Sequence, residues 1–191
     1  MPDTNVIIAI EGLDGSGKTS VGAALAAELG AEFVSGTPSS WLGADLNTLM
    51  RDYTAPARYL LYLARAVWIG QSYTDSELPV VVDRYLASCH ALHVGVPRKY
   101  RDSLAGLPVP PPSLAFYLDV SEPERLRRLA MRGLPEDPFE RELRQDAEFR
   151  ALVQCRFMAG DGMIHIQTDG LPVCDVASRA AERVRSALGV E

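Results

Sequence analysis

One stretch near the N-terminus, Gly12 to Thr19, constrains the fold of this chain more than any other. It reads Gly-Leu-Asp-Gly-Ser-Gly-Lys-Thr and fits G-x-x-x-x-G-K-[ST], a loop whose backbone N–H groups cradle phosphates. In such a loop the glycines let the backbone approach an anion, the lysine reaches the β- and γ-phosphates, and the final hydroxyl ligates Mg²⁺. The stretch therefore predicts an ATP-binding site formed by Gly12, Asp14, Gly15, Ser16, Gly17, Lys18, Thr19 and Ser20.

The flanking sequence supplies the context that this loop needs. Val6 to Ile10 is an apolar, β-branched run, typical of a buried parallel strand. Apolar residues recur at helical spacing between Ser20 and Leu29, so a helix should follow and point its positive end at the phosphates. A glycine-rich turn without a ligand is the alternative. Against this alternative, Lys18 and Lys99 are the only lysines among 19 basic residues. In a chain with so few lysines, a lysine at the position that the motif requires favours phosphate binding.

The composition excludes several classes of protein. A chain of 191 residues fits one domain, and a net charge of −6 argues against general attraction to nucleic acid or anionic membranes. No apolar run has the length of a membrane span, and the first residues lack the features of a signal peptide. Three well-separated cysteines without metal-ligand spacing predict reduced thiols. We therefore expect a cytoplasmic protein.

Strand and helix patterns alternate along the rest of the chain. Strands are expected at 32–35, 80–83, 114–120 and 163–167. Helices are expected at 44–51, 55–76, 85–94, 98–105, 122–131, 139–157 and 173–188, with a turn-rich break at 133–138. This alternation predicts an α/β fold, in which helices cover both faces of a parallel sheet. The loops after the strands should meet at one edge, where ligands bind.

Two residues at the end of the strand 80–83 carry chemistry. An Asp that ends such a strand, here Asp83, helps to hold Mg²⁺ or to orient the acceptor in phosphate-loop proteins. The alternative is an Asp that caps a loop. Arg84 follows at the same sheet edge and is placed to bind an acceptor phosphate with two hydrogen bonds.

Further arginines leave alternatives open. Arg65 lies in an otherwise apolar helix and either extends to solvent or points into a ligand cavity. A solvated helix face is one interpretation of Arg127, Arg128 and Arg132, and we adopt it for Arg127. Arg132 borders the break at 133–138 and could contact the transferring phosphoryl group, with Arg128 as the next candidate. The histidines show no triad order and no metal spacing, and His90 and His93 are interpreted as helix residues.

The ordered set of motifs resembles the thymidylate kinase family of nucleoside monophosphate kinases nearly end to end. The likeness rests on the phosphate loop with its internal Asp14, on Asp83-Arg84-Tyr85, on the strand that runs to Leu118-Asp119-Val120, and on a lid at about 133–139. The resemblance implies a P-loop fold with five parallel strands in a single domain over 1–191, ATP and Mg²⁺ as cofactors, and often a homodimer. It implies that Asp14 meets the acceptor sugar, Arg84 its phosphate and Arg65 its base. Because Ser16 stands where some members have Arg, the catalytic arginine is expected to be Arg132. Lys18 and Asp83 are the other expected catalytic residues.

The acceptor pocket departs from the family pattern. The segment after the second strand reads Gly36-Thr37-Pro38 and lacks the family's Arg, and Leu61 replaces the aromatic residue that stacks on thymine. Residues that read the base and the sugar are replaced by Cys89 and Leu92, near Tyr85. We therefore predict the metal ligands Thr19 and Asp83, and acceptor contacts from Asp14, Pro38, Leu61, Arg65, Arg84, Tyr85, Cys89 and Leu92.

The sequence thus predicts ATP-dependent phosphoryl transfer to a nucleoside monophosphate, with thymidylate as the family's acceptor. A kinase of the same fold with another acceptor, such as a modified nucleotide or a small metabolite, is the second hypothesis. A nucleotide-binding module without transferase activity is the third, and the Asp83-Arg84 pair argues against it.

Overall fold

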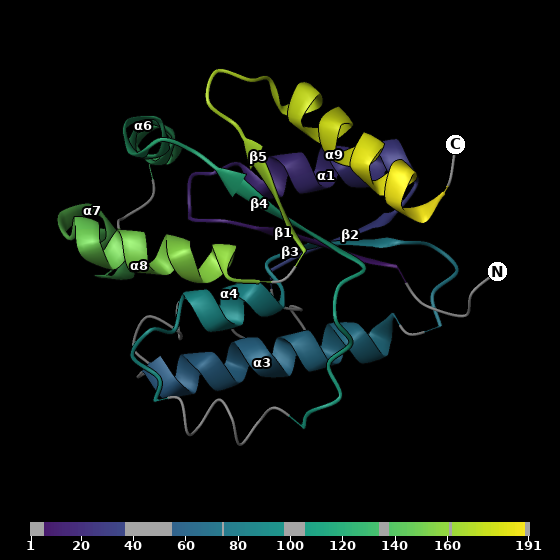
Figure 1. The fold of residues 1–191 in the computed structure, drawn as a ribbon, viewed down its shortest axis with the longest axis horizontal. Helices are drawn as coiled ribbons and strands as arrows, with labels where there is room; N and C mark the ends of the chain where they lie inside the picture. The colour runs from purple at the N-terminus through teal and green to yellow at the C-terminus, as the bar shows by residue number, and fades with distance from the viewer. Residues whose placement is uncertain are drawn as a thin grey trace.

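Five parallel strands form one sheet in the order β2–β3–β1–β4–β5 (Figure 1). The computed structural model describes residues 6–36, 55–73, 75–97, 106–133, 138–160 and 162–189. The strands are β1 (Ile7–Glu11), β2 (Glu32–Ser35), β3 (Val80–Asp83), β4 (Leu114–Asp119) and β5 (Met163–Gln167). The predicted five-stranded parallel α/β fold is confirmed.

Helices cover both faces of this sheet. The helices are α1 (Lys18–Leu29), α3 (Ala55–Ser72), α4 (Leu86–Ala91), α6 (Glu122–Arg132), α7 (Pro138–Gln145), α8 (Ala147–Met158) and α9 (Val173–Leu188). In Figure 1, α1 and α9 lie above the sheet, and α3, α4 and α8 lie below it. No helix of the described residues is long and apolar enough to cross a membrane.

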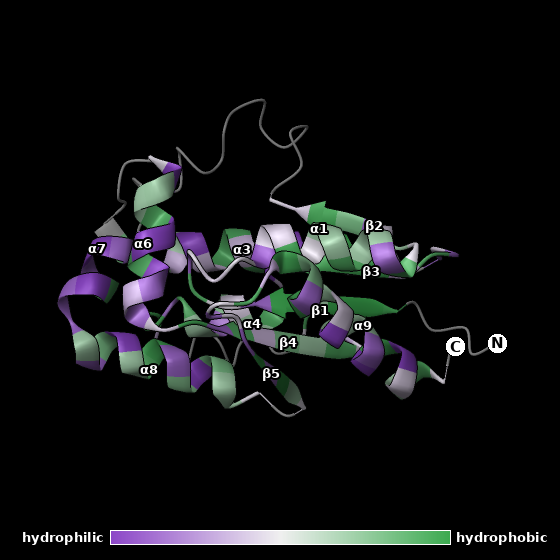
Figure 2. Ribbon diagram, turned by 90° about the horizontal axis from the view of Figure 1, so that it is seen from above, coloured by the Kyte–Doolittle hydropathy of each residue, from purple (hydrophilic) through white to green (hydrophobic). Residues whose placement is uncertain are grey.

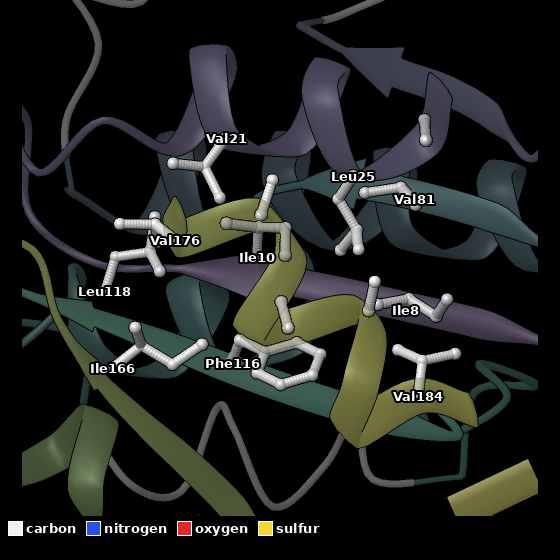
Figure 3. Close-up of a cluster of buried hydrophobic side chains, with 14 of the residues drawn as sticks. Ile8, Ile10, Val21, Leu25, Val81, Phe116, Leu118, Ile166, Val176 and Val184 are labelled. Carbon is white, nitrogen blue, oxygen red and sulfur yellow. The ribbon is translucent and has the colours of Figure 1, made fainter. Parts of the chain in front are cut away.

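Alternation along the strands divides the core into two layers. Successive residues of a strand point to opposite faces of the sheet, so Ile8 and Ile10 pack on one side while Ile7 and Ala9 pack on the other. Figure 3 shows the first layer, in which Ile8 and Ile10 lie among side chains of α1, α9 and the neighbouring strands. Hydrophobic residues dominate the central strands, whereas α6 and α7 are largely hydrophilic (Figure 2). Each of these polar helices still buries a side chain: Arg125 of α6 and Leu143 of α7.

Three predicted helix boundaries differ from the structure. The single helix expected at 139–157 is two helices, because Asp146 leaves the helical conformation and its carboxylate accepts a hydrogen bond from Phe149 N at 2.9 Å to begin α8. The helix expected at 55–76 ends at Ser72, before a turn in which Ser76 Oγ donates to Leu78 O at 2.9 Å. The helix expected at 85–94 spans only Leu86–Ala91, so His90 lies in it and His93 lies beyond its end.

Some expectations concern residues outside the described ranges. These are Pro38, the helices expected at 44–51 and 98–105, and most of the lid at 133–139. Of the lid, the structure gives Gly133, which caps the end of α6, and the first residues of α7.

Candidate active site

The loop between β1 and α1 has a backbone that only glycine accommodates at two points. Gly12 has φ 146° and Gly15 has φ 87°, both in the region that favours glycine. A Cβ on Gly12 would lie 2.8 Å from Leu118 O, and a Cβ on Gly15 would lie 2.9 Å from Arg125 O. The loop is therefore packed against β4 and α6, and α1 begins directly after it at Lys18. This geometry is that of a phosphate-binding helix N-terminus.

Lys18 lies buried across its own loop. Its ammonium group donates to Leu13 O at 2.8 Å and lies 3.6 Å from Asp14 Oδ1. An ammonium has three donors, so it retains one beyond these two partners. Burial, with help from the charge of Arg84, lowers the Lys18 pKa to about 8. Binding of an anion would offset this cost of burial.

The register of the sheet brings Asp83 to the phosphate loop. Ile10 of β1 pairs with Asp83 of β3, and Asp83 Oδ2 accepts hydrogen bonds from Thr19 Oγ1 at 2.6 Å and from Ser35 Oγ at 3.2 Å. Its other oxygen, Oδ1, is buried without a hydrogen-bond partner among the described residues, as is Ser16 Oγ. Buried oxygens of this kind are costly unless a ligand pairs with them.

These groups fit a magnesium ion. Mg²⁺ prefers oxygen ligands and is bound through one or two protein groups together with substrate phosphates. Asp83 Oδ1 and the Thr19 hydroxyl are such oxygens, at the end of the loop that would hold the phosphates. Within the described ranges, no group of three or more His, Cys, Asp or Glu side chains could hold a metal.

Arg84 crosses from β3 to the phosphate loop. Its guanidinium donates to Gly12 O at 3.0 Å, to Ser88 Oγ at 3.2 Å and to the carboxylate of Asp14. Burial opposes the charge of Asp14, but Arg84 and Lys18 outweigh it and hold the Asp14 pKa well below its usual range. The same pairing raises the Arg84 pKa. Asp14 and Arg84 are therefore both charged and face each other at the sheet edge.

A buried carboxylate fixes the backbone that carries Arg84. Glu11 Oε1 accepts from the N–H groups of Tyr85 at 3.0 Å and Ala87 at 3.1 Å, and Oε2 accepts from the Ser88 hydroxyl. Arg84 has φ 67°, a conformation that a residue with a side chain adopts only at a cost. The contacts of Glu11 hold the turn that follows. Burial raises the Glu11 pKa, so this carboxyl depends on its three donors.

Arg65 of α3 does not extend to solvent, and its proposed contact with the acceptor base stays a prediction. It is buried, and its guanidinium donates to Gly36 O at 2.6 Å, to Asp83 O at 3.0 Å and to Arg84 O. These carbonyls lie where β2 and β3 end. Arg65 thus ties α3 to the sheet edge that carries Asp83 and Arg84.

The remaining acceptor residues are distributed among apolar clusters. Tyr85 is buried in the core on the α3 side, where its hydroxyl donates to Pro110 O at 2.9 Å. Cys89 lies in the same cluster, and burial raises its thiol pKa to about 12. Leu92 packs against the cluster between α4 and α8, and Leu61 is half-buried on α3. Contacts of these four with an acceptor stay a prediction.

Arg125, in the helix before the lid, joins both sides of the lid to the phosphate loop. This arginine is fully buried. It makes two hydrogen bonds to Glu122, at 2.7 and 3.0 Å, a further ion pair to Glu140 of α7, and a hydrogen bond to Asp14 O at 3.2 Å. Burial opposes its charge, but the two carboxylates raise the Arg125 pKa. α6 and α7 are therefore anchored together at the loop.

The other arginines of α6 occupy different surroundings. Arg128 donates to Ser16 O at 3.3 Å and to Thr168 O at 2.8 Å, so it links the phosphate loop to the segment after β5. Arg127 is exposed and pairs with Glu124, as a solvated helix face predicts. Arg132 is exposed at the end of α6, and its charge contributes to the low pKa values of Asp14 and Lys18.

Sequence reasoning missed several residues of this site. The missed residues are Glu11, Ser35, Ser88, Arg125 and Glu140. Glu11 offered a signal, because an acidic residue directly after an apolar strand and before a phosphate loop is buried by position. Glu140 stood in the segment that resembles the lid, whereas Ser35, Ser88 and Arg125 offered no signal, because their contacts join elements distant in the chain.

Comparison with known proteins agrees with the geometry. A family model described as thymidylate kinase matches residues 10–170. A probable thymidylate kinase of Pyrobaculum calidifontis is 29% identical, over 97% of this chain and 95% of that protein.

Three solved structures share the fold. A thymidylate kinase from Candida albicans has a TM-score of 0.74 and 20% identity, covering 98% of this chain and 94% of that one. A thymidylate kinase from Ehrlichia chaffeensis has a TM-score of 0.68 and 18% identity, covering 95% and 99%. A deoxyadenosine kinase from M. mycoides, solved with dCMP and dCDP, has a TM-score of 0.66 and 18% identity, covering 95% and 100%.

Proposed function

The chain belongs to the thymidylate kinase family of nucleoside monophosphate kinases, and from that premise we propose how its own residues perform the reaction. The bond between the γ-phosphorus of ATP and the oxygen that bridges the β- and γ-phosphates breaks, and ADP leaves. An oxygen of the acceptor's phosphate forms the new bond to the γ-phosphorus. The product is a nucleoside diphosphate. Catalysis in this class of reaction is mostly positioning and charge stabilisation.

One observation carries the proposal. Asp83 and Arg84 are consecutive in the chain, yet the first touches Thr19 of the phosphate loop and the second reaches Asp14 and Gly12. A donor phosphate on the loop and an acceptor phosphate on Arg84 would therefore approach each other across this one turn. A nucleotide-binding module without transferase activity needs no arginine at that place, because it binds no acceptor phosphate.

Each residue has a stated task in this proposal. Lys18 and the loop N–H groups bind the β- and γ-phosphates, and Arg132 stabilises charge on the transferring group. Arg84 binds the acceptor phosphate and Asp14 contacts the acceptor sugar. Thr19 and Asp83 would hold Mg²⁺, which neutralises phosphate charge when bound.

The candidate acceptor pocket departs from the family pattern at Leu61, Cys89 and Leu92. Leu61 offers no aromatic face, so a base there loses a stacking interaction of about 1 kcal/mol. Cys89 donates to Tyr85 O at 3.5 Å and its thiol is buried, and Leu92 has no hydroxyl to sense the sugar. We expect thymidylate to be a weaker substrate than in typical members, with little discrimination between deoxy and ribo forms.

The test compares acceptors and one variant. Steady-state kinetics are measured with thymidylate, uridylate, deoxycytidylate and the unphosphorylated nucleosides. Arg84→Ala should raise the acceptor KM by about tenfold to a hundredfold, since a charge-assisted contact contributes about 1.5–3 kcal/mol, and should leave the ATP KM nearly unchanged. The exposed Arg127→Ala is the matched control.

Two results would contradict the proposal. A preference for an unphosphorylated nucleoside would remove the role of Arg84. Efficient use of thymidylate together with strong rejection of its ribo counterpart would contradict the altered pocket.

A further inference from the structure

A tyrosine of α3 shares the helix face that points to the candidate acceptor site. Tyr62 precedes Arg65 by three residues, so the two side chains are neighbours on the helix surface. The guanidinium of Arg65 ends on the carbonyl groups of Asp83 and Arg84. The face of α3 that carries Tyr62 is therefore turned toward the ends of β2 and β3, beside the arginine that would bind the acceptor phosphate.

The charged groups of that site influence the phenol of Tyr62. Burial raises its pKa, and the next largest influences are the charges of Arg84, Asp14 and Arg65. Tyr62 packs against the buried cluster that holds Val82 and Tyr85, the residues that flank Asp83 and Arg84 in the chain. Within the described part of the chain, this hydroxyl makes no hydrogen bond. A half-buried hydroxyl without a partner favours a polar ligand group.

A buried histidine braces the ring. The rings of Tyr62 and His93 meet edge to face, with centroids 5.1 Å apart at 62°. His93 also packs edge to face on Tyr59, at 5.7 Å. Its Nδ1 lies 2.9 Å from Cys89 O, and because a carbonyl oxygen only accepts, this nitrogen donates. His93 therefore has a fixed orientation and limits the motion of Tyr62.

We propose that Tyr62 is a specificity-determining residue that contacts the base of the acceptor nucleotide. This inference rests on the proposed function. The ring supplies aromatic surface on the face of α3 that carries Arg65. The hydroxyl both donates and accepts hydrogen bonds, so it pairs with a keto edge, as in thymine or uracil, and with an amino edge, as in cytosine. Tyr62 therefore favours a pocket that accepts several pyrimidine monophosphates.

The test separates base recognition from phosphate binding. Tyr62→Phe keeps the ring and removes only the hydroxyl. It should raise the KM for thymidylate and deoxycytidylate about threefold to tenfold, with the ATP KM within about twofold of the parent. Deoxyribose 5-phosphate, which lacks a base, is used as a competitive inhibitor, and its Ki should be the same in parent and variant.

Tyr73→Phe is the matched control, because Tyr73 follows the end of α3 and packs on Trp68, with ring centroids 6.5 Å apart. It should leave all four constants, the three KM values and the Ki, unchanged. Equal acceptor KM values in the parent and Tyr62→Phe would overturn the inference, as would an equal weakening of deoxyribose 5-phosphate, which indicates a general disturbance of the site. A parent enzyme that phosphorylates no nucleoside monophosphate rejects the proposed function itself, and the role of Tyr62 with it.

Discussion

Acidification should destabilise this protein through one buried histidine. His93 is 4% exposed and lies against Tyr59 and Tyr62. Burial is the main cause that lowers its pKa from 6.5 to about 4, and the charges of Arg58 and Arg84 act in the same direction. The hydrogen bond to the Cys89 carbonyl opposes them. The imidazole is therefore neutral in the folded protein at neutral pH.

The sign and size of the effect follow from linkage. The unfolded chain binds a proton at His93 near pH 6.5, whereas the folded protein resists it until about pH 4. The stabilising contribution of the neutral, packed ring is thus complete above pH 6.5 and is lost as the pH falls from 6.5 toward 4. A difference of this size in pKa corresponds to about 3 kcal/mol, a large part of a typical folding free energy of about 5–15 kcal/mol.

Urea denaturation at a series of pH values between 7.5 and 4 measures this directly. The parent should lose about 3 kcal/mol more than His93→Asn over that range, since Asn provides an N–H donor and does not titrate. His165→Asn is the control, because His165 is exposed to water. Parallel stability curves for the parent and His93→Asn would refute the reasoning.

Three further substitutions have distinct expected outcomes. Gly70→Ala places a Cβ 2.4 Å from Cδ of Pro110, so overpacking of about 1–3 kcal/mol should outweigh the gain of about 1 kcal/mol from replacing a helical glycine, and thermal unfolding should show a net loss. Arg125→Met removes the buried guanidinium that both Glu122 and Glu140 bind, and it should cost about 3–5 kcal/mol in urea denaturation. Arg127→Met should change stability by less than about 0.5 kcal/mol; equal effects would contradict the role of Arg125 as an anchor. Arg132→Ala should lower kcat more than it raises the ATP KM. An unchanged kcat in initial-rate assays would show that Arg132 is a solvent-exposed residue of α6 without a catalytic role.

The sequence was sufficient for features that depend on neighbours along the chain. The phosphate loop, the strand before it and the helix after it occur as predicted, because one continuous segment carries all their signals. Asp83 also ends its strand as expected, since apolar β-branched runs identify buried parallel strands. The five strands of the sheet follow from the same periodicity.

Other features depend on contacts that sequence spacing does not reveal. Arg65 binds backbone carbonyls, and no residue type announces such partners. The division between α7 and α8 depends on a single cap at Asp146, inside a pattern that otherwise continues as a helix. The position of Tyr62, one residue after the expected aromatic, is interpretable only because the structure shows which face of α3 meets β3.

Phosphoryl transfer itself is the central claim, and Lys18 tests it most directly. Phosphorus NMR follows ATP and thymidylate with the parent and with Lys18→Ala, after circular dichroism has established that both are folded. The parent should produce ADP and thymidine diphosphate in equal amounts, and the variant should do so at least about a hundredfold more slowly. Equal rates for the two proteins, or ATP consumption without formation of the diphosphate, would contradict this account.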